Sequence, residues 1–218
     1  MLERYRHLRE ISRRHNEAIQ KLISQESILQ HARRLGLARG NTFLLEDLDE
    51  LTYALDLAIH TAPPGRSRAI DRYAESAGAP LDGDERLMLD AMRASRFSIL
   101  RIERRHPIVG LVTTDLALGA QGWLIDIGLE SSVSDGATLA TRLYMVDGFS
   151  MTAGVNVPLD TTTMLALFAE PPRHLKRQPF NVVVNDRRFA ETIYRTALAS
   201  GLMDRVAYRD ASSPAGGS

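Results

Sequence analysis

Apolar and polar residues alternate along two neighbouring stretches of the chain, Leu139 to Val146 and Phe149 to Val157. A period of two is typical of a β-strand with one buried and one water-facing side. Between the two stretches, Asp147-Gly148 supplies the positive φ angles that a two-residue hairpin turn requires. We therefore predict a β-hairpin. Its water-facing side is predicted to carry Ser150, Thr152, Gly154 and Asn156.

Three further runs of β-branched or aromatic residues precede this hairpin, at Phe97 to Glu103, Val109 to Asp115 and Trp123 to Ile127. Short strands joined by brief loops must close on themselves or be covered, because open strand edges pair with other chains. We therefore predict a small antiparallel five-stranded barrel from Arg96 to Leu159. It resembles the SH3-like and Sm-like barrels in strand number and size. Such barrels bind peptides, bind RNA or serve assembly, so this resemblance does not specify a function.

Apolar residues recur at helical spacing before this region. Leu2 to Ile23 is predicted to be a long amphipathic helix with arginines on its outer face. Ser24 is expected to cap a second helix, which ends at Gly36, a residue suited to the left-handed conformation after a helix. A third helix is predicted over Leu51 to Ile59, after an acidic segment that complements its dipole. Shorter helices are expected at 67–77, 84–95 and 161–169.

These elements predict an α+β protein with a helical N-terminal region at 1–62, a linker with helices at 63–95 and the small barrel at 96–160. A C-terminal strand-helix-strand unit is expected at 161–209. In that unit Phe180 to Val184 would form the first strand, Asn185 or Asp186 would cap the helix, and Val206 to Tyr208 would form the second strand. The small, polar, Gly-rich segment 210–218 is predicted to be disordered.

Composition narrows the classes of function. The chain has 218 residues and no cysteine, which excludes disulfides, thiolate catalysis and thiolate metal sites. No apolar run approaches the ~20 residues that span a bilayer, and the charged N-terminus is unlike a signal peptide. We therefore expect a cytoplasmic protein with no membrane segment. Lys21 and Lys176 are the only lysines, and this strong preference for arginine indicates a bacterial genome of high GC content.

Charge is segregated along the chain although the formal net charge is zero. Residues 1–40 carry nine basic against four acidic side chains, and residues 41–60 carry five acidic side chains and no basic one. Residues 170–209 carry eight basic against four acidic side chains. Such segregation indicates where partners or neighbouring elements dock, and it says little about the fold.

The segment 32–42 resembles the Ala-x-x-Leu-Gly-Leu centre of bacterial helix-turn-helix proteins, in which the next helix enters the major groove of DNA. The resemblance covers about twenty residues. It makes Arg33, Arg34 and Arg39 candidates for a binding surface. Gly40-Asn41 is poor helix sequence, however, and the acidic residues at 46–50 would be repelled by phosphate. Nucleic-acid binding is therefore the less favoured alternative, and an ordinary helix C-terminus is preferred.

Other candidate sites are weak, and we predict no catalytic residue, cofactor or metal. Glu3, His7 and Glu10 share one helix face, but local sequence gives fewer than the three or four ligands that a metal needs. Ser150 does not stand in a Gly-x-Ser-x-Gly elbow. The strand-end carboxylates Asp115, Asp126, Asp135 and Asp147 are more typical of turns than of an acidic site.

The aromatic residues of the barrel are candidates for a stacking surface. Trp123 and Phe149 fall on the apolar side of their strands, which leaves Tyr144, beside Arg142, as the better surface candidate. Arg142 and Tyr144 therefore join the three N-terminal arginines as a candidate binding surface.

The sequence thus favours a non-enzymatic protein-interaction or regulatory module whose protein partner it does not identify. A nucleic-acid-binding regulator is the alternative, and an enzyme with a site assembled from distant residues comes third. The apolar stripe of the first helix, with Leu8, Ile11, Ile19 and Leu22, must either mediate self-association as a homo-oligomer or pack on its own chain.

Overall fold

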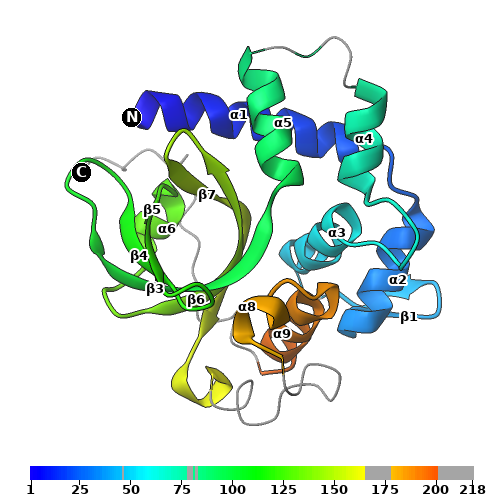
Figure 1. Ribbon diagram of the computed structural model, residues 1–218. Coiled ribbons are helices and arrows are strands. Elements are labelled where there is room, and N and C mark those ends of the chain that lie inside the picture. Colours follow the sequence, from blue (N-terminus) through cyan, green and yellow to red (C-terminus); the bar gives the residue numbers. More distant parts are fainter. Residues whose placement is uncertain (46, 78–80, 82, 165–177, 201–218) are drawn as a thin grey trace, which may run out of the picture.

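The computed structural model describes residues 1–45, 47–77, 81, 83–164 and 178–200 of the chain, and it combines helices with one five-stranded sheet (Figure 1). The N-terminal elements are α1 (Leu2–Gln20), α2 (Gln25–Leu35), the short strands β1 (Ala38–Arg39) and β2 (Thr42–Phe43), the 3-10 helix η1 (Leu48–Glu50), α3 (Leu51–His60), α4 (Ala69–Ala77) and α5 (Gly83–Arg93). The central elements are β3 (Arg96–Arg105), β4 (Leu111–Asp115), β5 (Ala120–Leu124), α6 (Ile127–Ser132), β6 (Thr138–Val146) and β7 (Phe149–Leu159). The C-terminal elements are α8 (Phe180–Val183) and α9 (Arg187–Ala199).

The five strands of the sheet pair in the order β3-β4-β5-β7-β6, and β6 pairs again with β3, so that the sheet forms a closed barrel. Four of the pairings are antiparallel, as predicted. The fifth, between β5 and β7, is parallel and is registered at Leu124 and Ser150. The prediction of a wholly antiparallel sheet is therefore wrong, because closure brings the ends of two strands together in the same direction. We call this element the closed sheet.

The β6-β7 hairpin forms as predicted. Asp147 and Gly148 have φ angles of 50° and 83°, the two positive values of a tight hairpin turn. The predicted water-facing side of β7 is wrong, since Thr152 and Asn156 are buried. Thr152 lies opposite Leu143 on the neighbouring strand β6. Leu143 belongs to an apolar cluster that is formed by residues of the closed sheet and of α6. Closure turns this side inward, while Val157, on the other side, packs onto helices α2, α3 and α9.

The predicted strand at Trp123 to Ile127 is correct only in its first part. The strand ends at Leu124, and α6 follows. Asp126 initiates that helix, because its carboxylate accepts a hydrogen bond from the Leu129 amide at 3.0 Å. The Asp126 carboxylate also accepts hydrogen bonds from Thr152 and Arg9, which tie α6 to β7 and to α1.

Helix α1 lies across one end of the closed sheet (Figure 1). Leu8, Ile11 and Ile19 are each no more than 1% exposed, and they share a cluster with residues of α4 and α5. These three residues of the predicted stripe therefore pack on their own chain, the second of the two alternatives above. Leu22, the fourth, lies beyond the end of α1 and is 49% exposed. Arg4 extends the contact by pairing with Asp84 on α5.

The segment 32–42 does not form a helix-turn-helix. Ser24 caps α2, and the helix ends at Gly36 with a left-handed φ of 86°, both as predicted. The chain then enters the β1-β2 hairpin, in which Arg39 pairs with Thr42, and no second helix is presented to a DNA groove. Gly40, with a φ of 57°, makes the turn of this hairpin. A recognition helix would not contain such a turn.

The C-terminal unit begins with a helix, so the predicted strand at Phe180 to Val184 is wrong. Val182 and Val183 amides donate to the carbonyl of Pro179 and form the single turn of α8. The closed barrel offers this segment no open edge to join. Asp186 caps α9 as predicted, and Phe189 lies on its buried side. The second predicted strand, the end of the 161–169 helix and the 210–218 tail lie outside the described residues.

Candidate functional site: an arginine groove

A buried ion pair joins the closed sheet to two helices. Arg142 on β6 donates from Nε and from a terminal nitrogen to the two oxygens of Asp56 on α3, at 2.8 and 3.0 Å. The Tyr194 hydroxyl on α9 donates to the same carboxylate at 2.9 Å. Burial alone would raise the pKa of Asp56, but the charge and hydrogen bonds of Arg142, with the bond from Tyr194, hold it below its ordinary value. These three side chains fix α3, α9 and β6 to one another.

Two further titratable groups surround this pair. Burial, and then the charge of Arg142, lowers the pKa of His60 to about 3, so that its imidazole is neutral near neutral pH. Ser95 lies 3.2 Å from His60 Nδ1. Tyr144 is 1% exposed, and burial, together with the nearby carboxylate of Asp56, raises its pKa to about 12. The prediction of Tyr144 as a surface residue is wrong, because helices cover its side of β6.

Two adjacent depressions lie beside this centre, lined by residues of α2, α3, α4 and α9 and of the loop between α3 and α4. Figure 1 shows the positions of these helices. The larger has a volume of about 520 Å³ and is lined by α2, by the loop and helix that follow α3, and by the start of α9. The smaller has a volume of about 300 Å³ and extends to the first residues of β3 and to Arg142. Thr61, Ala62, Arg66 and Arg187 line both depressions. We call the two together the arginine groove.

The larger depression is strongly basic. It is lined by Arg34, Arg66, Arg72 and Arg187, against the single carboxylate of Glu26. The smaller depression is also basic. It is lined by Arg66, Arg68, Arg96, Arg142 and Arg187, against the single carboxylate of Asp186. Neither carboxylate is available to balance these charges, since arginines outside the lining already bind both.

Arg33 binds Glu26 at 3.0 Å, and Arg188 binds Asp186 at 2.8 Å. Within the smaller depression, Arg68, Arg96 and Arg142 are paired with Asp71, Asp115 and Asp56. In the described part of the chain, Arg66 and Arg187 form no ion pair with a carboxylate. The two arginines that line both depressions thus have no carboxylate partner among the described residues. Arg72, which lines only the larger depression, has none there either.

The positive charge of the groove affects the pKa of His31. Its Nδ1 is buried and has no hydrogen-bond partner among the described residues. Burial, followed by the charge of Arg34, lowers the pKa of His31 to about 4. The carboxylate of Asp56 opposes this shift, and Arg187 adds a smaller lowering effect. A neutral imidazole with a free ring nitrogen therefore lies in the wall of the larger depression.

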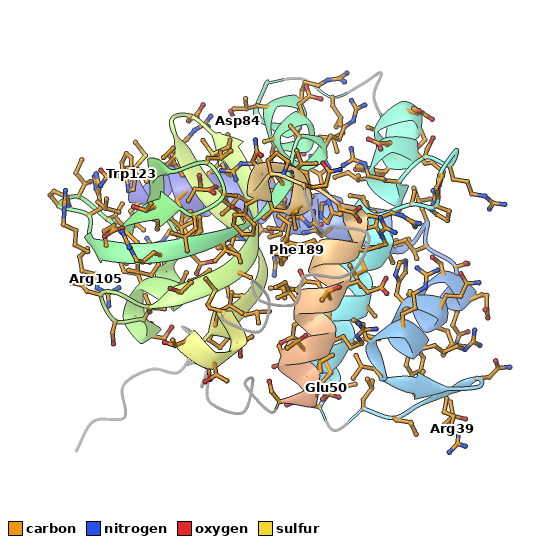
Figure 2. All side chains as sticks on the ribbon, turned by 60° about the horizontal axis from the view of Figure 1, so that its bottom comes forward. Arg39, Glu50, Asp84, Arg105, Trp123 and Phe189 are labelled. Atoms are coloured by element: carbon orange, nitrogen blue, oxygen red, sulfur yellow. The ribbon has the colours of Figure 1, made fainter. Side chains whose placement is uncertain are left out.

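The structure does not bring the five predicted surface residues together. Arg33 binds the Gly40 carbonyl at 2.6 Å and holds the β1-β2 hairpin against α2. Figure 2 shows Arg39 on that hairpin, at the far side of the molecule from the closed sheet. Arg34 lines the larger depression, and Arg142 lines the smaller one although it is mostly buried. Tyr144 lines neither.

Sequence reasoning missed Arg66 and Arg187. Arg66 follows Pro63-Pro64-Gly65 in a loop, and Arg187 is the first residue of α9, so 121 positions separate them. Neither stands in a local motif, and only the packing of α9 beside α3 brings both to one groove.

The strand-end carboxylates do not converge on one site. Asp115 binds Ser98 and Arg96, Asp126 caps α6, and Asp147 binds Arg4. Among the described residues, no three His, Asp or Glu side chains are grouped so that they could hold a metal ion.

Residues 1–201 match a family described as "Family of unknown function (DUF7986)". The chain belongs to this family. The matched region contains every residue of the arginine groove and of the Asp56 centre. No curated protein and no solved structure matches the chain. None of the helices that the structure describes is long and apolar enough to cross a membrane.

Proposed function

We propose that this protein is a non-enzymatic regulatory or interaction module that recognises an anionic ligand in the arginine groove. The observation that carries the proposal is the position of Arg66 and Arg187. Both line the two depressions of the groove, and neither has a carboxylate partner among the described residues. An anion placed between them would contact two guanidinium groups from either depression.

The balance of charge in the groove favours a bound anion. Like charges that line one depression repel each other, and an anion relieves that repulsion when it binds. Arginine also presents planar N–H pairs that match the oxygens of carboxylate and phosphate groups. The net charge of the whole chain is zero, so the basic groove is a local concentration and not a property of the surface in general.

The groups beside the groove favour binding over catalysis. A general base near neutral pH needs a pKa close to the working pH. His60, with a pKa of about 3, is far below that value, and Asp56 is held by Arg142 and Tyr194. These groups are suited to holding the shape of a binding site and not to transferring protons.

The groove's charge also supports the alternative of a nucleic-acid-binding regulator. Segment 32–42 does not support it, because this segment does not form a helix-turn-helix. We keep two further proposals that rest on sequence and strand number alone. One is that the closed sheet is related to the SH3-like barrels and offers a surface to a protein partner. The other is that the protein acts in the bacterial cytoplasm.

Phosphate binding tests the proposal. Isothermal titration calorimetry would compare the wild type with Arg66→Gln/Arg187→Gln, at constant ionic strength maintained with chloride. The matched control is Arg104→Gln/Arg195→Gln, which removes the same charge from two exposed side chains outside the groove. We expect phosphate to bind the wild type and the control and to lose at least about tenfold in affinity in the groove variant. Equal binding to both variants, or no binding to any of the three proteins, would reject the proposal.

A further inference from the structure

The number of arginines around the larger depression exceeds what one phosphate group needs. Arg34, Arg66, Arg72 and Arg187 line it, and its one carboxylate is bound to Arg33. We infer that the ligand of the groove is a short linear oligophosphate of two or three phosphoryl groups, either free or as the phosphate chain of an ester. This inference rests on the proposed function, since it specifies the anion that the groove recognises.

The lining of the groove divides its unpaired and weakly paired arginines into two sets. Arg66 and Arg187 line both depressions, so a first phosphoryl group bound between them stands where the two depressions meet. Arg34 and Arg72 line only the larger depression, whose volume of about 520 Å³ leaves room for the rest of a chain. The phosphate chain would therefore run from the shared pair into the larger depression.

The existing contacts of the second pair leave it able to bind. Arg34 is 46% exposed and lies 3.7 Å from the Glu191 carboxylate, a long ion pair at the surface. Arg72 donates from one terminal nitrogen to the Ser67 carbonyl at 2.7 Å, which orients its guanidinium without neutralising it. The three arginines that line only the smaller depression, Arg68, Arg96 and Arg142, are each paired with an aspartate. Free positive charge is thus concentrated at the shared pair and in the larger depression.

The lining of the groove disfavours a nucleic-acid strand. Proteins that bind single strands stack bases on aromatic side chains. No Phe, Tyr or Trp from the described residues lines the larger depression, and Phe97, which lines the smaller, is 4% exposed beneath the Arg142 guanidinium. The groove therefore offers donors to a phosphate chain but no face to a base. A base attached to the chain would add little to the affinity.

Calorimetric titrations with phosphate, diphosphate, triphosphate and ATP, at equal ionic strength and without a divalent cation, test this inference. We expect triphosphate to bind the wild type at least about tenfold more tightly than phosphate, with ATP close to free triphosphate. In Arg34→Gln/Arg72→Gln this preference for the longer chain should disappear while phosphate still binds. The Arg104→Gln/Arg195→Gln control should keep the wild-type order. Thermal melts of each variant would establish that it is folded.

The outcomes separate this inference from the proposed function. If phosphate binds in a manner that depends on Arg66 and Arg187 but triphosphate binds no more tightly, the oligophosphate is rejected and the anion groove stands. If neither anion binds, both are rejected. A mixed-sequence single-stranded oligonucleotide that binds more tightly than triphosphate would also reject the oligophosphate and would favour the nucleic-acid alternative.

Discussion

Arg142 and Asp56 form a bidentate ion pair in the interior of the molecule, with nitrogen–oxygen distances of 2.8 and 3.0 Å. Each residue is 6% exposed, and 86 positions separate them in the chain. The pair therefore holds α3 and the closed sheet together at the side of the arginine groove.

Removal of one member of this pair should be strongly destabilising. Arg142→Met leaves the Asp56 carboxylate buried without its cation, and we expect the free energy of unfolding to fall by about 3–5 kcal/mol. Asp56→Leu/Arg142→Met, which removes both charges, should lose less than Arg142→Met alone. Urea denaturation measures both. Arg101→Met, which breaks an exposed pair with Glu103, is the control and should cost under about 1 kcal/mol. Equal losses for Arg142→Met and Arg101→Met would contradict the account of the buried pair.

Stability should depend on pH through His60. Its pKa is about 3 in the folded protein and 6.5 ordinarily, so between these values the unfolded chain binds a proton that the folded protein does not. The free energy of unfolding should therefore fall as pH decreases below 6.5, with His60 contributing up to about 1.4 kcal/mol per pH unit. The groups that act on His60 are Arg142, Asp56, Arg68, Asp71 and Ser95.

His60→Asn removes this titration. Urea denaturation of both proteins, from neutral pH down to about 4.5, should give a shallower slope for the variant. Other titrating groups are common to the two proteins, so the difference in slope belongs to His60. Parallel slopes would show that His60 titrates alike in the folded and unfolded states.

Gly148→Val should destabilise the β6-β7 hairpin. No atom lies within 4 Å of the position that a Cβ would take, so the cost comes from a φ of 83°. A β-branched residue at such an angle costs on the order of 1–3 kcal/mol. The control is Gly122→Ala in the same sheet, where φ is not positive and the nearest atom to a Cβ is Thr113 Oγ1 at 3.7 Å. A thermal melt that ranks the two variants in the opposite order would refute this explanation.

Ile11→Glu/Ile19→Glu should unfold the protein. Both side chains are at most 1% exposed and pack with α4 and α5, so the variant buries two charges without partners. Circular dichroism would record the loss of cooperative unfolding. A folded variant that sediments as a monomer, beside a dimeric wild type, would show instead that α1 mediates self-association.

Sequence reasoning succeeded where one local interaction decides the structure. Ser24 and Gly36 delimit α2, and Asp147-Gly148 makes the hairpin turn, because each of these features depends on a few adjacent residues. The limits of the strand region, Arg96 and Leu159, were also predictable, since turn residues and alternation mark them.

The errors arose where contacts between distant parts of the chain determine the local structure. The alternation in β7 is clear, but alternation does not tell which side becomes the interior of a closed sheet. Val182 and Val183 have high strand propensity, yet their amides donate to the carbonyl of Pro179 and form a helical turn. The candidate site could not be predicted for the same reason. Arg66 and Arg187 are distant in sequence, and only the packed arrangement of α3 and α9 places them in one groove.

The most direct test of anion binding in the groove is an NMR titration of the His31 imidazole with and without triphosphate. Burial is the main cause of the low His31 pKa of about 4, and the charge of Arg34, with a smaller effect of Arg187, lowers it further. An anion bound beside these two arginines offsets their part of the shift. We expect triphosphate to raise this pKa in the wild type. The rise should be lost in Arg66→Gln/Arg187→Gln and retained in Arg104→Gln/Arg195→Gln. A His31 pKa that saturating triphosphate leaves unchanged in the wild type would reject anion binding in the arginine groove.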